Sequence, residues 1–128
     1  MAKKEFRYKG KSVEELKQMT SGEFAKITTS RIRRTINRGF TDEEKKFLDK
    51  LAKDKDKPVK THCRTMVVLP EMISKKVKVH TGKVFQDLEI LPEMVGHTLG
   101  EFVQSRNRVA HSSPGVGASR SSAGVQKK

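Results

Sequence analysis

The 128-residue sequence contains a single cysteine, a single tyrosine and no tryptophan. Because Cys63 has no partner in the chain, an intramolecular disulfide is excluded, and such cysteine usage is typical of a reducing compartment. The longest uninterrupted aliphatic run is Met66–Leu69, whereas a membrane-spanning helix needs ~20 apolar residues. The lysines near the N-terminus are followed by no apolar stretch, so we expect no signal peptide. We therefore expect neither a disulfide-stabilised nor a membrane-spanning protein.

Apolar residues are also scarce, while positive charge is abundant. Hydrophobic residues make up 34% of the chain, and 28 lysines and arginines stand against 15 acidic residues, for a formal net charge of +13. This length suffices for one compact core but not for two. A surface with so much charge of one sign repels itself, and a bound polyanion relieves that repulsion. The composition therefore favours a small domain completed by an anionic macromolecule.

The surplus charge is concentrated in the two flanks of the chain. Residues 1–57 carry 17 basic and 10 acidic side chains, residues 58–103 carry 6 and 5, and residues 104–128 carry 5 and none. Since the nearly neutral middle is also the most apolar part, we predict that it forms the folded core and that the flanks follow a nucleic-acid backbone. The Ser- and Gly-rich end has too few apolar residues to fold when free. The predicted divisions are a basic arm with short helices over 1–40, an α+β core over 41–111 and a flexible basic tail over 112–128.

Capping patterns predict four helices before residue 58. The segments Ser12–Glu15, Thr20–Glu23 and Thr41–Glu44 each place Glu three residues after Ser or Thr, which is the capping-box pattern of a helix start. Ser30 is expected to cap the third helix, and Gly39 is expected to end it. Apolar residues recur at helical spacing behind each of these starts.

After the last of these helices the apolar period changes from about 3.6 to 2 residues, the period of a half-buried strand. Three segments are predicted as strands: Arg64–Leu69, Lys76–His80 and Val84–Ile90. The expected fold class is α+β, with a small, three-stranded and mostly antiparallel sheet, N-terminal helices packed on it, and extended basic termini.

The third predicted helix carries the densest group of arginines. Arg31, Arg34 and Arg38 fall at i, i+3 and i+7, hence on one face, with Arg33 beside them. Guanidinium groups match phosphate geometry, and a helix fixes their spacing. Few acidic residues lie near enough to neutralise this face, which favours phosphate binding over a merely solvated surface. A small DNA-binding protein that places the Arg31–Arg38 helix in a major groove is the alternative, with Asn37 as a base-reading residue.

Two further cationic groups are candidates for nucleic-acid contacts. Alternation along the strand over 76–80 would place Lys76, Lys78 and His80 in one outward row, with Lys75 beside it, although edge lysines often only block strand association. The stretch 106–111 contains no acidic residue, so it is either an unspecific cationic tail or a contact segment. Its candidate residues are Arg106, Asn107, Arg108 and His111.

Enzymatic sites are poorly supported. His62 beside Cys63 lacks the additional ligands that a metal site needs, and no glycine-rich phosphate loop precedes a lysine. Asp87 and Glu89 share one strand face without an apolar pocket, so they read as surface carboxylates. We expect no enzyme, no metal and no cofactor.

The segment over 81–105 carries a specific motif. It reads Thr81-Gly82-Lys83, six residues, Ile90, four residues, Val95-Gly96, two residues, Leu99-Gly100-Glu101-Phe102, two residues, Ser105. This motif resembles the signature of the S-nineteen family of small-subunit ribosomal proteins. The resemblance extends over about residues 42–111, through Lys60–Met66 and Lys76–His80, and the helical residues 1–40 look like the archaeal or eukaryotic branch.

The resemblance implies a structural RNA-binding protein in the head of the small ribosomal subunit, ribosome-bound in the cytoplasm and beside a neighbouring ribosomal protein. It implies a C-terminal tail near the region where transfer RNA is decoded, with transfer RNA as a further partner of the tail. By position it implies RNA contacts from the strand lysines, His97 and the 106–111 stretch. Together with the charge pattern, the candidate RNA-binding residues are Arg31, Arg33, Arg34, Arg38, Lys60, Arg64, Lys75, Lys76, Lys78, Lys83, His97, Arg106, Asn107, Arg108 and His111.

At three positions of the motif, the backbone conformation or the close packing explains why the residue is glycine. Gly82 allows a hairpin turn with positive φ, and Gly96 and Gly100 remove side-chain bulk where the chain or an RNA backbone must come close. We expect Glu101 to accept hydrogen bonds from free amides or to anchor an arginine. Because most phenylalanines are needed in helices or the core, phosphate and shape recognition should dominate over base stacking.

Overall fold

The computed structural model describes residues 5–54 and 57–109. The predicted tail over 112–128 and the candidate residue His111 lie outside these residues. The helices are α1 (Val13–Gln18), α2 (Ser21–Ile27), α3 (Ser30–Arg38) and α4 (Asp42–Lys53), the strands are β1 (Val59–Thr61), β2 (Lys76–His80) and β3 (Phe85–Glu89), and the 3-10 helices are η1 (Pro70–Met72), η2 (Pro92–Met94) and η3 (Leu99–Glu101).

All three predicted capping boxes are present. The side chains of Ser12, Thr20 and Thr41 each accept a hydrogen bond from the amide three residues later, and the glutamate there accepts one from the cap amide. The expected Ser30 cap is wrong, because α3 begins one residue earlier than predicted, with Thr29 as its N-cap and no side-chain cap bond. Gly39 ends α3 with a φ of 85°, as the pattern predicted.

The three strands form one mixed sheet in the order β1-β2-β3. β1 is parallel to β2, whereas β2 and β3 form the predicted antiparallel hairpin. The inward side chains Val77 and Val79 are fully buried, while Lys76 is exposed and Lys78 half-exposed on the other face. The α+β class is confirmed, and the alternation along β2 gives the sheet one apolar and one cationic face.

The predicted strand over Arg64–Leu69 is wrong. The third strand is instead β1, and the Met66–Leu69 run is buried along its whole length rather than on alternate residues. Its backbone pairs with the signature segment: the Val68 amide donates to the His97 carbonyl at 2.8 Å, and the Leu99 amide donates to Met66 at 3.0 Å. Among the described residues, the run forms one isolated β-bridge, between Val67 and Thr98, and no strand. It is therefore a buried apolar segment that connects β1 to η1.

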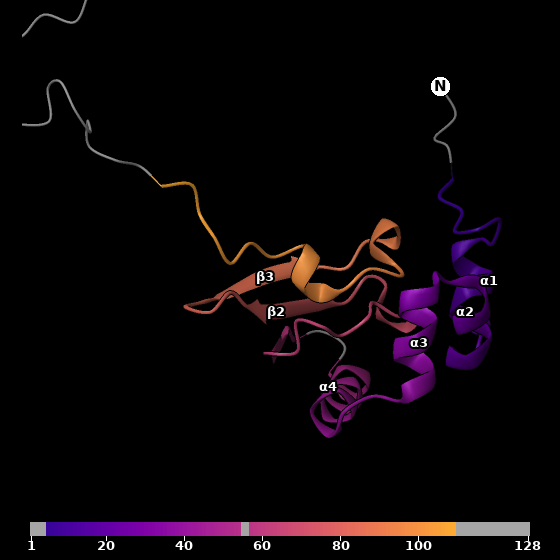
Figure 1. Cartoon of the computed structure of the whole chain (residues 1–128), viewed down its shortest axis with the longest axis horizontal. Helices are drawn as coiled ribbons and strands as arrows, with labels where there is room; N and C mark the ends of the chain where they lie inside the picture. Colours follow the sequence, from indigo (N-terminus) through magenta and orange to yellow (C-terminus); the bar gives the residue numbers. More distant parts are fainter. Residues whose placement is uncertain (1–4, 55–56, 110–128) are drawn as a thin grey trace, which may run out of the picture.

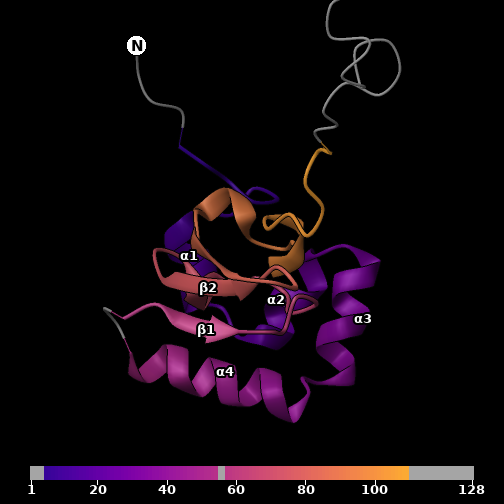
Figure 2. The same ribbon diagram turned by 90° about the vertical axis from the view of Figure 1, so that its left-hand side faces the viewer.

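The helices and the sheet share one hydrophobic cluster. Figures 1 and 2 show α1, α2 and α3 grouped beside the sheet and α4 running alongside β1. Leu16, Phe24 and Phe47 from the helices are buried in the same cluster as Val79 and Leu99. Burying this surface is the main favourable contribution to folding, and it fixes the position of α3 relative to the signature turn.

The signature glycines serve close approaches within the chain. At Gly96, which has a φ of 81°, an added Cβ would lie 2.5 Å from the Tyr8 hydroxyl oxygen. At Gly100 it would lie 2.9 Å from the backbone oxygen of Arg64. Gly82 adopts a φ of 105° in the β2–β3 turn. The prediction that these glycines shape the chain is confirmed.

Gly100→Ala is expected to destabilise the protein by about 1–3 kcal/mol, because the new methyl group forces apart two tightly packed backbone segments. The same Arg64 oxygen accepts the Gly100 amide hydrogen bond at 2.8 Å, so the segments cannot separate freely. Urea denaturation measures the effect. Gly22→Ala is the matched control: an added Cβ there meets nothing within 4 Å, and alanine favours the helix. Equal midpoints for the two variants would contradict the prediction.

Candidate nucleic-acid interface

α3 presents the predicted arginine face to solvent. Ile32 and Ile36 are buried and fix the opposite side of the helix in the core, which leaves Arg31, Arg34 and Arg38 exposed. The helix contains no acidic residue. Among the residues that the structure describes, none of these three arginines forms an ion pair. Their charge is therefore available to an external anion.

Two clefts flank this arginine face. Arg31 and Arg38 line a cleft of about 410 Å³ whose other walls include Arg64, Thr65, Thr98 and the capping-box residue Glu44. Ser30, Asn37 and Arg34 line a neighbouring cleft together with Arg38. The fold thus brings α3 next to the signature turn, although about 60 residues of sequence separate them. The arginine face and Thr98 form one continuous surface that a folded polyanion can follow.

Three of the candidate cations, Arg33, Lys75 and Arg64, donate hydrogen bonds to backbone carbonyls within the fold. Arg33 donates from Nε to the Ala25 carbonyl at 3.0 Å and from Nη2 to the carbonyls of Lys26 and Thr28. These bonds satisfy carbonyls at the C-terminal end of α2, which have no partner within the helix. Lys75 does the same for α4, because its Nζ donates to the Leu51 carbonyl at 3.0 Å. Both side chains position helices.

Arg64 joins three segments through its guanidinium group. Its Nη1 donates to the His80 carbonyl at 2.7 Å, and its Nη2 donates to the carbonyls of Gly100 at 3.1 Å and Val103 at 2.7 Å. The end of β2, η3 and the start of the C-terminal segment are thereby held together. The sequence pattern grouped Arg64 with the RNA-facing cations, and the geometry gives it an internal structural role.

The outward row of the sheet is present as predicted. Lys60 of β1 and Lys78 of β2 are register partners on the face opposite the buried valines. Lys78 Nζ lies 3.0 Å from a carboxylate oxygen of Asp87, so part of its charge is neutralised. Lys76 and Lys83 are exposed. This second cationic surface is interrupted by two carboxylates, because Asp87 is the register partner of Lys78 and Glu89 that of Lys76, and it is weaker than the α3 face.

The signature turn orients a histidine through a carboxylate. His97 Nδ1 lies 2.7 Å from Glu101 Oε2, while Glu101 Oε1 accepts hydrogen bonds from the Thr98 hydroxyl and amide. The hydrogen bond from the Thr98 hydroxyl, and with it those from His97 and the Thr98 amide, holds the pKa of Glu101 below its usual value. Glu101 therefore satisfies an amide, as predicted, rather than an arginine. His97 Nε2 has no hydrogen-bond partner in the described part of the chain and can meet an external one.

The C-terminal candidates Arg106, Asn107 and Arg108 are all exposed. They follow the turn that Arg64 anchors, so the chain leaves the core as a cationic segment.

Within residues 5–54 and 57–109, no group of three His, Cys, Asp or Glu side chains could hold a metal ion. None of the helices in the described chain is long and apolar enough to cross a membrane.

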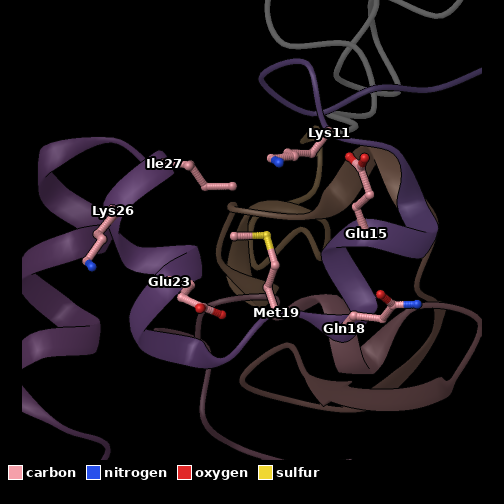
Figure 3. Close-up of a pocket in the computed structure, with 7 residues that line it drawn as sticks. All are labelled: Lys11, Glu15, Gln18, Met19, Glu23, Lys26 and Ile27. Carbon is pink, nitrogen blue, oxygen red and sulfur yellow. The ribbon is translucent and has the colours of Figure 1, made fainter.

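A third cleft, between α1 and α2, has a different character. Figure 3 shows Met19 and Ile27 side by side with Glu15, Glu23 and Lys26 around them. Glu15 and Glu23 offset the charges of Lys11 and Lys26, so this cleft lacks the surplus positive charge of the arginine face.

Sequence reasoning missed one grouping on the cationic face of the sheet. His62, His80 and Phe85 come together where β1 and β2 end and β3 begins. Their proximity depends on the position of β1. The prediction had placed this strand over residues 64–69, so the proximity could not be foreseen. Once the register of β1 against β2 is known, the pairing of the two histidines follows.

A model of the ribosomal protein S19 family matches residues 33–111, which is well over half of the chain. The matched segment begins within α3 and contains the sheet, the Arg64 anchor and the signature turn.

Proposed function

The chain belongs to the ribosomal protein S19 family, and from this premise we propose how it binds RNA. As a small-subunit ribosomal protein it binds ribosomal RNA and has a structural role in the ribonucleoprotein. The proposal is that it holds folded ribosomal RNA chiefly by phosphate and shape contacts. The observation that carries it is the arginine face of α3, which is exposed, forms no ion pair within residues 5–54 and 57–109, and lies beside a cleft that reaches Thr98.

The proposed RNA-facing residues are the candidates that no backbone carbonyl engages among the described residues, together with His111. Arg33, Arg64 and Lys75 act instead as positioning residues, since their donors are engaged by backbone carbonyls. Phosphates of folded RNA lie at uneven spacing, and several separate cationic groups on a rigid core match such a surface. The proposed contacts are Arg31, Arg34, Arg38, Lys60, Lys76, Lys78, Lys83, His97, Arg106, Asn107, Arg108 and His111.

The finer placement is also a proposal. We place the protein in the head of the small subunit of cytoplasmic ribosomes, beside a neighbouring head protein, with its C-terminal tail near the decoding region and within reach of transfer RNA. Residues 104–128 carry five basic and no acidic side chains, which suits a tail that lies among phosphates. The family match begins at residue 33, so α1 and α2 precede it, and this supports the archaeal or eukaryotic branch.

The alternative of a DNA-binding protein rests on α3 alone. Such a protein would contact the major groove with Asn37 and the arginines of α3. The cations of the sheet and of the C-terminal segment would then make no contact with the DNA. The cleft beside α3 includes a wall from the signature turn, which suits an irregular polyanion better than a straight duplex.

Competition binding tests the proposal. The full chain is bound to small-subunit ribosomal RNA, and duplex DNA is added at matched salt. We expect duplex DNA to be a poor competitor, and the logarithm of the RNA affinity to fall steeply with the logarithm of the salt concentration, because each neutralised phosphate contributes about 0.7–0.9 to the slope. Equal displacement by duplex DNA, or a slope near zero, would reject phosphate recognition of folded RNA as the function of this surface.

A further inference from the structure

Three aromatic rings lie together at one end of the cationic sheet face. The ring centroids of His62 and His80 are 4.4 Å apart, those of His80 and Phe85 are 4.8 Å apart, and those of His62 and Phe85 are 5.1 Å apart. The two pairs with Phe85 are edge-to-face, at interplanar angles of 77° and 65°. Such contacts are attractive because the positive edge of one ring meets the negative face of another.

The sheet register places these rings on one face. Thr61 pairs with Val79 in the parallel ladder, so the next residues, His62 and His80, are neighbours. His80 pairs with Phe85 in the antiparallel ladder. Since side chains alternate along a strand, all three lie on the same face as Lys60 and Lys78 and opposite to Val79, which faces the core.

The cluster is not part of the hydrophobic core. Phe24 and Phe47 are buried there, and Phe40 and Phe102 pack against it, whereas Phe85 does neither. His62 is exposed, and His80 and Phe85 are half-exposed. A phenylalanine and two imidazoles outside the core leave an aromatic surface in contact with water, which a planar apolar ligand would cover.

Polar and cationic groups surround this aromatic surface. The Gly82 amide donates to His80 Nδ1 at 3.1 Å, which fixes the ring and leaves Nε2–H of the neutral imidazole as a free donor. Lys60 Nζ lies 5.4 Å from the centroid of Phe85, and Lys83 is exposed in the adjoining turn. Rings for stacking thus lie beside ammonium groups for phosphates.

We propose that His62, His80 and Phe85 form a stacking site for one unpaired base of RNA, with Lys60 beside it for the phosphate of the same strand. The proposal rests on the proposed RNA-binding function and deepens it, because base stacking on aromatic side chains is the usual way to hold unpaired RNA bases. Two imidazoles without a third metal-ligating group do not form a metal site, and none was found among the described residues. The site is expected to accept any base, since every base has a π-face.

The test uses two RNA hairpins that differ by one base. One carries a single-nucleotide bulge with 2-aminopurine, and the other carries an abasic bulge at the same position. We expect the protein to bind the first about tenfold more tightly, and to quench its fluorescence, because stacking involves only the base. Phe85→Leu is expected to abolish both the preference and the quenching, and Phe85→Trp is expected to keep them.

Matched variants separate this site from the general RNA affinity. Gln86→Ala changes an exposed neighbour in β3 outside the cluster and should keep the preference. Arg34→Ala should weaken binding to both hairpins equally. His62→Ala gives a second, exposed site variant if Phe85→Leu unfolds the sheet.

The outcomes distinguish the two proposals. If the unsubstituted protein binds both hairpins equally, or if Phe85→Leu and His62→Ala keep the preference, the stacking site is rejected while the arginine-dependent RNA binding stands. If neither hairpin nor small-subunit RNA is bound in a salt-dependent way, the proposed function itself fails. Binding of a protein segment at this face, with no response to the base, would also overturn the stacking site.

Discussion

Replacement of Arg31, Arg34 and Arg38 together by alanine is expected to reduce the salt dependence of ribosomal RNA binding by about two to three units of log–log slope, because each lost phosphate contact removes about 0.7–0.9 of a unit. The affinity should fall at least about tenfold at low salt, where these contacts are least screened. The three side chains are exposed and without ion pairs among the described residues, so their removal leaves no buried group without a partner.

The fold should tolerate this triple variant. Alanine has a higher helix propensity than arginine, and the buried side of α3 keeps Ile32 and Ile36. A far-UV circular dichroism spectrum and a urea denaturation curve check this point before binding is measured. Filter binding at several salt concentrations then gives the slope.

A charge-matched triple variant is the control. Lys11, Lys17 and Lys26 are exposed, and two of them line the α1–α2 cleft together with Glu15 and Glu23. Their replacement by alanine changes the net charge by the same amount but should change the slope little. If both triple variants weaken RNA binding equally, the effect reflects the total charge of the protein, and the α3 face is not the interface.

Arg64→Ala is expected to cause the largest loss of stability of any single substitution considered, about 2–4 kcal/mol, because hydrogen bonds that involve a charged group each contribute more than neutral ones. The guanidinium is half-buried and donates to the carbonyls of His80, Gly100 and Val103. Its removal leaves all three acceptors to find water or remain unpaired. For a domain of this size, the thermal midpoint should fall by roughly 10 °C or more.

Two variants give this prediction its controls. Arg64→Lys should recover only part of the loss, since one ammonium cannot reproduce the planar fork that reaches three carbonyls. Arg34→Ala removes an exposed arginine that no carbonyl engages and should leave the midpoint nearly unchanged. Full stability of Arg64→Ala combined with weakened RNA binding would instead make Arg64 an RNA contact.

The two predictions divide the arginines by the partner of their guanidinium groups. In the sequence, Arg31, Arg33, Arg34 and Arg64 look alike: all are cations in a basic protein. In the structure, Arg33 and Arg64 donate to backbone carbonyls, whereas Arg31 and Arg34 are exposed and form no such bond among the described residues. The residue types predict that the protein has a cationic surface. Which arginines are available on that surface depends on which of them lie near backbone carbonyls that accept their hydrogen bonds.

Features that depend on neighbours within a few residues could be predicted without the structure. The capping boxes of α1, α2 and α4, the β2–β3 hairpin and the positive φ of Gly82 all follow from contacts within such short range. The signature over 81–105 identified the family because its spacing is a property of the sequence alone. Local hydrogen bonds and side-chain alternation need no knowledge of the rest of the fold.

Contacts between distant segments could not be predicted, because they depend on how the whole chain folds. The acceptors of Arg64 lie 16, 36 and 39 residues further along the chain, and the Met66–Leu69 run finds its backbone partners in the signature turn rather than in a strand. His62 contacts His80 only because the short strand β1 lies parallel to β2. The sequence pattern of β1 is weak, and the prediction placed this strand at residues 64–69 instead. Such pairings are selected by burial of the whole core, which no short window of sequence encodes.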